Sequence, residues 1–353
     1  MEKPTRRTFL QSAALGTTAA AFAGTAVKAQ TASRIRVAHI VPESSKMYRL
    51  SVEPFERVIS EIAEDEISVQ VFSGGTIAPP LQTYQAVQDG LADAGMVPPI
   101  WAVNQDPVNS LFGGHPGGMS AEQLLNWYYV GGGQELLAEH RRETMGLHSM
   151  LLSMNPSEVW HSHKKIQVPE DLKGVRFRTA GAWATILNET FGGAATTVGP
   201  SDVFTMLERR GVDAAEWSTP SENVIMGLEN AAPYMIVPGI HAPAAVLELA
   251  IRAEVWDQLD PKIQKKIEIA ARETVLECLT EWNVADLKAM EQIRERGVEI
   301  IEMDPSLISS IRQAGRDWAE AQAQARAADG DDWMHRVTES YYAFYDSWQA
   351  NSI

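Results

Sequence analysis

Arg178 is the residue of this sequence that is best suited to bind an anion. It ends a predicted strand, residues 174–178, and lies where a parallel strand would open into a cleft. Its planar guanidinium can bind a carboxylate through two parallel hydrogen bonds, which a lysine cannot reproduce. Alternation along the strand puts Arg176 on the same face. The pattern alone therefore leaves two interpretations open, a ligand clamp or a solvated pair of arginines.

Glu216 and Trp217 form a second candidate for chemistry. They follow a short apolar segment that predicts a strand, so the carboxylate of Glu216 is carried toward a buried strand end. A buried carboxylate needs a cation, a hydrogen-bond donor or a proton. Two interpretations stay open, a salt bridge to a neighbouring arginine or a ligand for a hard cation beside the aromatic ring.

Three further residues could complete a binding site, and each also has a plain structural explanation. Asn155 ends another predicted strand and could orient a ligand oxygen or form an Asx turn. His241 lies in a proline-flanked loop, where a packed histidine is more common than a ligand-binding one. Trp101 could form an apolar wall together with Trp217, although tryptophans usually belong to the core or to partly covered surface.

The sequence lacks familiar catalytic motifs. No Gly-Lys-Ser/Thr follows its glycine-rich segments, and neither Gly-x-Ser-x-Gly nor His-Glu-x-x-His occurs. His161 and His163, followed by two lysines, predict an exposed turn because no third metal ligand lies nearby. A periplasmic enzyme that uses Glu216 or His241 as a general base is therefore the weaker hypothesis.

The elements that would position these residues alternate between strand and helix. Residues 34–41 and 68–72 predict strands, and amphipathic helices are predicted around residues 52–62 and 80–90. This order predicts an α/β fold with a largely parallel sheet. Further strands are predicted at residues 148–154, 174–178, 234–237, 246–251 and 298–301.

Two segments, residues 84–95 and 204–216, share one pattern of a helix ended by glycine, a tight turn with Asp-Ala, and a short strand. The similarity between the two segments can arise from the common signals that end a helix before a strand, or from a true structural duplication, and both explanations fit equally well. In either case each unit delivers the residues after its strand, 97–101 and 216–218, to a shared crevice.

The C-terminal third is predicted to be mainly helical. Asp260 and Pro261 form a good N-cap and first-turn pair, and a last helical region spans about residues 306–347. A long C-terminal helix could support a homodimer, and it suits packing across both lobes equally well.

The start of the chain predicts export. Arg6 and Arg7 precede a weakly hydrophobic run rich in Ala, Gly and Thr, so residues 1–29 are expected to be a twin-arginine signal peptide of a periplasmic protein. The remaining 324 residues can bury a core in two lobes, and Cys278 is the only cysteine, so no intrachain disulfide can form.

The net charge argues against nucleic acid as a partner. The chain carries a formal charge of −16, and removal of residues 1–29, with four basic residues and one acidic residue, makes it −19. Such a surface repels nucleic acid and anionic lipid. One desolvated arginine in a closed cleft can still bind an anion, because distant surface charge is screened by salt.

The sequence resembles the DctP-type solute-binding proteins of tripartite ATP-independent periplasmic (TRAP) transporters. Four segments carry the resemblance, residues 85–93, 171–178, 211–217 and 238–243, and the Lys-Gly-x-Arg-x-Arg strand is the most specific. The resemblance implies a two-lobed periplasmic-binding-protein architecture, type II-like, with a cleft between the lobes and long C-terminal helices. In this family the second arginine of that strand pairs with the ligand carboxylate, which assigns the clamp to Arg178.

Within the family, the sequence is most similar to the branch that binds 2-oxo or 2-hydroxy monocarboxylates with a metal ion. The resemblance implies that Glu216 ligates a calcium or sodium ion, that Trp217 adds its backbone carbonyl and covers the ligand, and that Asn155 contacts the ligand. Some members have a glutamine shortly after that asparagine, whereas Pro-Ser-Glu follows it here. Ala242 replaces a glutamate or glutamine of the later loop, and His241 could substitute for it.

These observations predict a complete organisation. Lobe I is expected over residues 34–155, completed by about 245–300, with lobe II over 156–244 and a helical region over 301–353 that packs across both lobes. We expect a protein that captures a small organic anion and passes it to the small and large membrane subunits of a TRAP permease. A periplasmic sensor for a membrane receptor is the alternative. An oxo acid, hydroxy acid, dicarboxylate or sulfonate would each suit Arg178.

Overall fold

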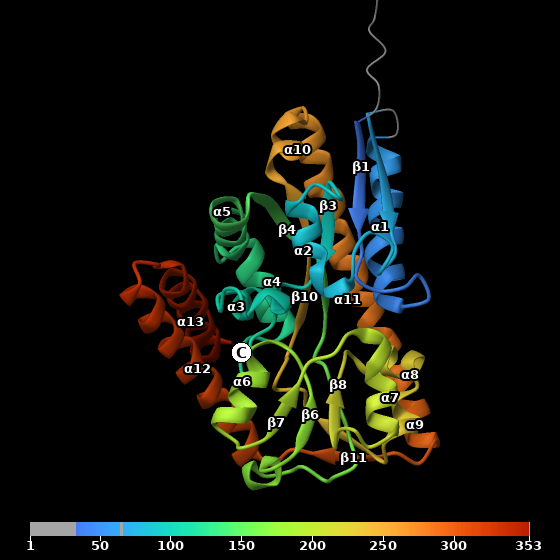
Figure 1. The fold of residues 1–353 in the computed structure, drawn as a ribbon, viewed down its shortest axis with the longest axis vertical. Coiled ribbons are helices and arrows are strands. Elements are labelled where there is room, and N and C mark those ends of the chain that lie inside the picture. The colour runs from blue at the N-terminus through green and yellow to red at the C-terminus, as the bar shows by residue number, and fades with distance from the viewer. Residues whose placement is uncertain (1–32, 64–65, 353) are drawn as a thin grey trace, which may run out of the picture. The chain divides into compact units, whose positions relative to one another are not determined.

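A computed structural model describes residues 33–63 and 66–352, and the predicted signal peptide lies outside this part of the chain. Residues 32–353 group into one compact unit, in which two β-sheets are surrounded by helices (Figure 1). None of the helices in the described ranges is both long enough and apolar enough to cross a membrane.

The first sheet has five strands, and one of them runs against its neighbours. In spatial order they are β2 (Ile67–Phe72), β1 (Ser33–Ala38), β3 (Ala94–Val97), β10 (Ala245–Arg252) and β4 (Leu147–Asn155). β1 pairs in parallel with β2 and β3, because a helix connects each strand to the next. β10 lies antiparallel between β3 and β4. Four of the five strands therefore run in the same direction, as the prediction of a largely parallel sheet requires. β10 is the exception, and it lies where the chain returns from the second sheet.

The second sheet has six strands. In spatial order they are β11 (Glu299–Glu302), β9 (Tyr234–Val237), β5 (Trp160–Ser162), β8 (Ala214–Glu216), β6 (Arg176–Arg178) and β7 (Ala194–Thr196). β5 is antiparallel to both neighbours, and the other pairs are parallel. We propose that each sheet is the centre of one lobe, lobe I for the first and lobe II for the second. β11 spans the boundary predicted at residue 300.

The segment that holds His161 and His163 is not the exposed turn that the sequence predicted. His161 lies on β5 and is fully buried, because this strand is enclosed between β8 and β9. The Nε2 atom of His163 lies 2.8 Å from the carbonyl oxygen of Leu207. The sequence did not predict this strand, because β5 is only three residues long, contains the polar residues His161 and Ser162, and is soon followed by two lysines.

Short helices follow the strands of both sheets. In lobe I they are α1 (Lys46–Ala63), α2 (Thr83–Gln88), α3 (Asn109–Gly113), α4 (Ala121–Tyr129), α5 (Gly133–Met145) and α10 (Ala253–Gln258). In lobe II they are α6 (Gly181–Glu189), α7 (Val203–Glu208), α8 (Pro220–Met226) and α9 (Leu228–Ala231). Single 3-10 turns, η1 (Pro80–Gln82), η2 (Pro99–Ala102), η3 (Pro169–Leu172) and η4 (Pro200–Asp202), lie in the connections.

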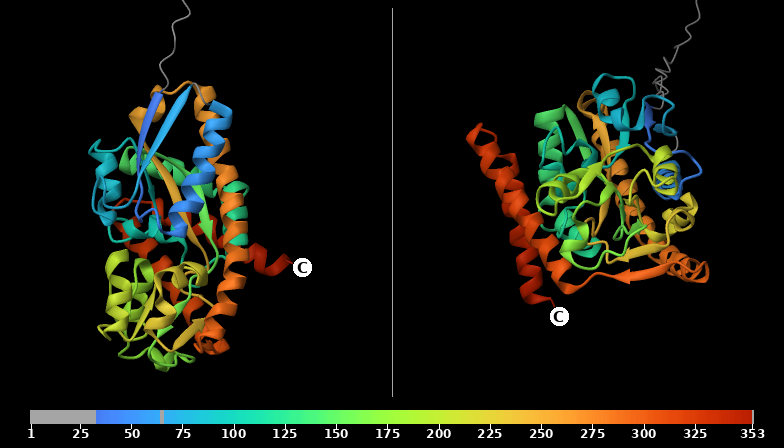
Figure 2. Two further views of the ribbon diagram at one scale, coloured as in Figure 1. Left: turned by 90° about the vertical axis from the view of Figure 1, so that its right-hand side faces the viewer. Right: turned by 60° about the horizontal axis from the view of Figure 1, so that its bottom comes forward.

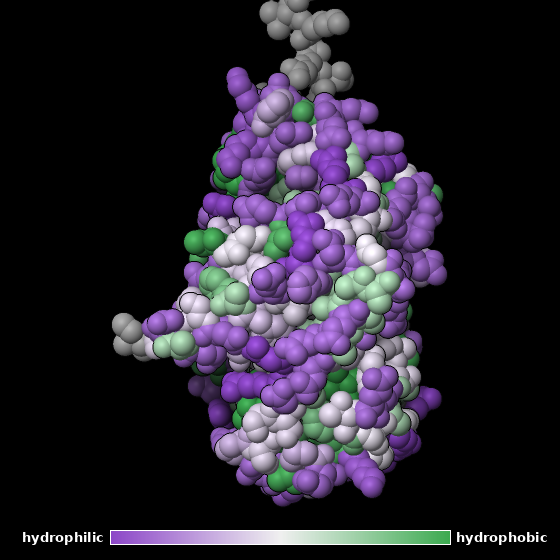
Figure 3. Space-filling model, turned by 90° about the vertical axis from the view of Figure 1, so that its left-hand side faces the viewer, coloured by the Kyte–Doolittle hydropathy of each residue, from purple (hydrophilic) through white to green (hydrophobic). Residues whose placement is uncertain are grey.

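Three long helices form the C-terminal part of the described chain, and the first of them contacts both lobes. α11 (Pro261–Glu295) packs on α1 and β4 of lobe I and on α8 of lobe II, and Figure 2 shows it running along both lobes. The side chain of Asp260 accepts a hydrogen bond from the backbone N–H of Lys262, which makes it the predicted N-cap. α12 (Pro305–Ala328) contacts α6, whereas α13 (Trp333–Asn351) contacts α4 and α5. The face on this side of the molecule is mostly hydrophilic, with smaller hydrophobic groups between (Figure 3).

A buried ion pair fastens β10 to the helices of lobe I. The Nε atom of Arg141 on α5 donates to Oε1 of Glu248 at 2.8 Å, and the hydroxyl of Tyr84 donates to the same oxygen at 2.5 Å. Both charged side chains are fully buried. Removal of one partner would leave the other charge uncompensated in the core.

We expect Arg141→Met to lower the free energy of unfolding by about 3–5 kcal/mol, because Glu248 would remain buried without its cation. Urea denaturation of both proteins measures this loss. Arg142→Ala is the matched control, since Arg142 pairs with Asp257 at the exposed surface and should contribute at most about 1 kcal/mol. Equal losses in the two variants would contradict the structural role of the buried pair.

Candidate functional site

A small cavity lies between the two lobes, where strands of both sheets end. Its volume is about 40 Å³, which is room for roughly three water molecules. Ile40, Met47 and Leu247 supply apolar wall from lobe I. The cavity is also lined by five of the six predicted site residues, namely Trp101, Asn155, Arg178, Glu216 and Trp217.

Arg178 ends β6 and is almost completely buried, with 2% of its surface exposed. Nη1 donates to the backbone carbonyl of Glu216 at 2.7 Å, and Nη2 donates to the carbonyl of Val198 at 2.8 Å. Nε is buried and has no hydrogen-bond partner among the described residues. The carbonyls thus fix the guanidinium, while its Nε edge keeps a donor for another group. The guanidinium carbon lies 5.3 Å from the ring centre of Trp217, a cation–π contact.

The structure distinguishes Arg176 from Arg178, which the alternation pattern of the sequence could not do. Arg176 begins β6, its side chain is 51% exposed, and its Nη2 donates to Oδ1 of Asp213 at 2.9 Å. Both side chains belong to one strand of three residues, but only Arg178 reaches the cavity. Position along the strand, and not the face of the sheet, decides which arginine meets a ligand.

Glu216 ends β8 and satisfies parts of both interpretations given above. Its Oε1 lies 3.4 Å from Nη1 of Arg178 and accepts a hydrogen bond from the backbone N–H of Ala180 at 3.1 Å. The carboxylate is therefore paired with an arginine and also faces the cavity. Trp217 follows with 7% exposure, and its indole N–H has no partner in the described residues.

Asn155 and Trp101 line the cavity from lobe I. Asn155 ends β4, is buried, and its amide nitrogen lies 3.4 Å from the hydroxyl of Ser218. Trp101 lies in η2, directly after β3, as the shared-crevice argument predicted. These two residues provide one amide and one aromatic wall opposite Arg178.

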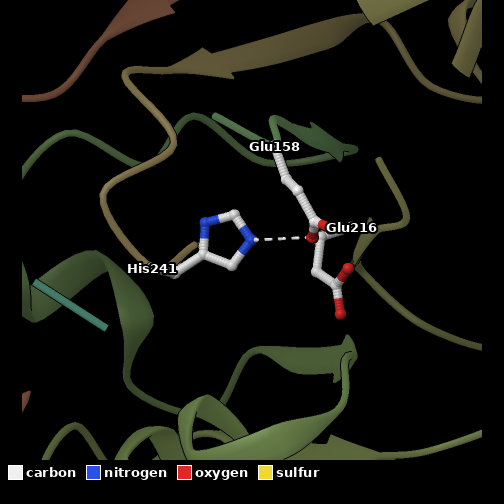
Figure 4. A group of neighbouring side chains, drawn as sticks. All are labelled: Glu158, Glu216 and His241. Atoms are coloured by element: carbon white, nitrogen blue, oxygen red, sulfur yellow. Dashed lines mark ion pairs between the residues drawn. The ribbon is translucent and has the colours of Figure 1, made fainter. Parts of the chain in front are cut away.

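His241 does not line the cavity, but it lies beside Glu158 and Glu216 (Figure 4). Its Nε2 is 3.9 Å from Oε2 of Glu158, and one ligand atom of each of the three side chains lies within 4.8 Å of the others. All three are buried, and within the part of the chain that the structure describes neither ring nitrogen of His241 has a hydrogen-bond partner. Buried polar atoms without partners are rare in folded proteins, so this group fits a bound cation.

Burial changes the protonation of two members of this group. It raises the pKa of Glu158 well above its ordinary value of 4.5, and the nearby carboxylate of Glu216 adds to the rise. Burial lowers the pKa of His241 to about 4, so its imidazole is neutral at neutral pH. Neutral imidazole and ionised carboxylate are the forms that bind metals, and a cation would draw the proton from Glu158.

Glu158 is not among the site residues predicted from the sequence, because the segment after Asn155 was interpreted only as a departure from the family pattern. Glu158 lies between β4 and β5, and its backbone N–H donates to the carbonyl of Ala242 at 3.0 Å. A carboxylate three residues after a strand that ends in the cleft was the available signal. Its partner His241 is far away in sequence, so the pairing itself had no local signature.

We expect the stability of the metal-free protein to fall as pH rises above about 4.5, since folded Glu158 holds its proton to a higher pH than the unfolded chain. Glu158→Gln removes this dependence, so it should raise the melting temperature in chelator more at pH 8 than at pH 5. Glu170→Gln, at an exposed position of lobe II, is the control. A Glu158→Gln effect that does not depend on pH would contradict the assignment.

Solved TRAP transporter solute-binding proteins share this fold. The protein from Bordetella bronchiseptica, a mixed-occupancy dimer with copurified calcium and picolinate, has a TM-score of 0.84 and 19% identity, covering 90% of this chain and 93% of that one. The protein from Pseudoalteromonas atlantica, with bound sodium and pyruvate, has a TM-score of 0.83 and 22% identity, covering 90% and 95%. These similarities confirm the predicted two-lobed α/β architecture with long C-terminal helices.

A curated relative supports the same conclusion from sequence. The monocarboxylate 2-oxoacid-binding periplasmic protein of Nostoc sp. is 24% identical over 300 residues, which cover 84% of this chain and 79% of the relative. Residues 37–325 match the family described as bacterial extracellular solute-binding protein, family 7. The match confirms the predicted periplasmic location and a binding rather than an enzymatic role. The chain belongs to this family, the DctP proteins.

Proposed function

We propose that the chain captures a small 2-oxo or 2-hydroxy monocarboxylate together with one metal ion, for uptake by a TRAP transporter. One observation carries the proposal, namely that Arg178 is buried at the cavity with a guanidinium N–H that no group in residues 33–63 and 66–352 accepts. The Nostoc relative binds monocarboxylate 2-oxoacids, and the Pseudoalteromonas neighbour holds pyruvate, which supports the same class of ligand.

Arg178 would bind the ligand carboxylate through one edge of its guanidinium. Nε and Nη2 lie on the same edge, and Nη2 carries a second hydrogen beyond the one donated to Val198. Two parallel N–H groups on one edge match the two oxygens of a carboxylate. Because the side chain is already fixed by two carbonyls, little conformational entropy is lost on binding.

The cation would be held beside this carboxylate by Glu216 and by the backbone carbonyl of Trp217, as the resemblance implies. A 2-oxo or 2-hydroxy oxygen next to the carboxylate gives the ligand a second oxygen donor for the same ion. The cation would lower the cost of burying the carboxylates of ligand and protein together. The sequence prediction named calcium or sodium, and the two solved neighbours contain one each.

The rest of the cavity would select the size of the ligand. Asn155 can donate to the oxo or hydroxy oxygen, whereas Trp101, Trp217 and the aliphatic side chains form an apolar wall for the tail. Among the lining residues, Arg178 is the only cationic side chain. The volume of about 40 Å³ favours a compact monocarboxylate over a dicarboxylate, whose second charge would be buried unpaired.

Delivery would involve the small and large membrane subunits of the permease. A homodimer is part of the same proposal, since the Bordetella bronchiseptica neighbour is a dimer and α11, α12 and α13 offer long helices for such an interface. The negative charge of the chain gives no support for nucleic acid as a partner.

We expect Arg178→Ala to weaken pyruvate binding at least about a hundredfold, because the ligand carboxylate would be buried without its bidentate partner. Arg178→Lys keeps the charge but loses the parallel donors, so it should bind with an intermediate affinity. Isothermal titration calorimetry, with calcium or sodium present, measures these affinities.

Arg176→Ala is the matched control, since this arginine lies on the same strand and pairs with Asp213 outside the cavity. It should bind pyruvate as the wild type does. Micromolar affinity retained in a folded Arg178→Ala protein would overturn the proposed clamp.

A further inference from the structure

The side chains around Glu216 include a nitrogen donor that a site for sodium or calcium does not need. We propose that Glu158, Glu216 and His241 hold a divalent first-row transition-metal ion, in contrast to the sodium and calcium of the two solved neighbours. The inference rests on the proposed function, because this ion would share the ligand with Arg178.

The backbone brings the three donors together through a close contact of two loops. Gly239 lies so near the chain at Glu158 that a Cβ atom there would be 1.4 Å from the Glu158 carbonyl oxygen. The N–H of Glu158 donates to the carbonyl of Ala242 in the same loop. The absence of a side chain at Gly239 thus lets the loop with His241 approach Glu158, and β8 delivers Glu216 from the other side.

The spacing of the donor atoms fits one ion. Transition-metal ligands at about 2.0–2.2 Å from the ion lie at most about 4.4 Å apart. The distance of 3.9 Å between His241 Nε2 and Glu158 Oε2 falls within this limit, and the upper bound of 4.8 Å for the group needs only a small movement. Calcium, with longer bonds to oxygen, fits the spacing too, so the donor types must decide.

The imidazole decides in favour of a transition metal. Sodium and calcium prefer oxygen ligands, whereas imidazole suits zinc, iron and nickel. Both ring nitrogens of His241 are free of hydrogen bonds to the described residues, so either can present its side to an ion. The ring packs against Trp160 with centroids 5.2 Å apart, which fixes its position.

The charge of the site accommodates a divalent ion. With Glu158 ionised, Glu158 and Glu216 contribute two negative charges, Arg178 contributes one positive charge, and a monocarboxylate ligand adds a third negative charge. A divalent cation makes this buried group neutral, whereas a monovalent cation makes it neutral only while Glu158 keeps its proton. The charge therefore fits either kind of ion, and the imidazole of His241 decides between them.

The test is calorimetric titration of chelator-treated protein with CuCl₂, ZnCl₂ and CaCl₂ in separate experiments, each with and without pyruvate. We expect copper and zinc to bind at least about tenfold more tightly than calcium, because imidazole suits both. His241→Gln should lower the affinities for copper and zinc at least about tenfold and change the calcium affinity much less. Pulsed electron paramagnetic resonance of the copper form should show a nitrogen coupling that this variant loses.

His335→Gln is the control, because His335 is an exposed histidine beside Glu339 that could bind metal at the surface. It should leave all affinities and the nitrogen coupling unchanged. Calcium bound as tightly as zinc, or a nitrogen coupling that persists in His241→Gln, would overturn the inference.

The outcome for the proposed function is read separately. Pyruvate binding that needs Arg178 and is supported best by calcium would overturn only the choice of ion. Tight binding of zinc without any binding of small acids would overturn the proposed function and leave the metal site in place.

Discussion

The balance of buried charge between the lobes is the constraint on which the rest of the site depends. Arg178, Glu158 and Glu216 are each at least 94% buried, so their charges cannot be compensated by water. Without a ligand, the proton that burial holds on Glu158 supplies the balance. With an anion and a cation bound, that proton is no longer needed. Anion and cation must therefore strengthen each other's binding by the same factor.

The balance of buried charge arises because strands of both sheets end at the cavity between the lobes. Lobe II contributes Arg178 and Glu216, while lobe I contributes little charge and much apolar wall. The lobes also meet at Glu222 of α8, which accepts hydrogen bonds from the hydroxyl of Ser45 at 2.7 Å and from the backbone N–H of Lys46 at 3.0 Å, at the start of α1. Closure of the cleft excludes water from the Arg178 pair, which strengthens its electrostatic interactions.

Sequence could predict the parts of this arrangement that depend on strand ends. Arg178, Glu216 and Asn155 lie at the ends of recognisable strands, so the rule for α/β sheets placed them correctly. β5 was not predicted, because a strand of three residues is too short to show a hydrophobic periodicity. The proximity of Glu158 and His241 was not predicted either, since it depends on contact between two loops that are distant in sequence. The antiparallel course of β10 likewise follows from tertiary structure and not from local pattern.

A buried charge or an unpartnered polar atom does not by itself identify a binding site in this protein. Arg141 and Glu248 are more deeply buried than Arg178 and Glu216, and each also has one polar atom without a partner. Neither lines the cavity between the lobes. They lie within lobe I, where one hydrogen-bonded ion pair and Tyr84 already occupy the space. We propose that the unpartnered donor of Arg178 binds a ligand, because it coincides with a cavity and with a second group of unsatisfied side chains, where the strands of lobe II end.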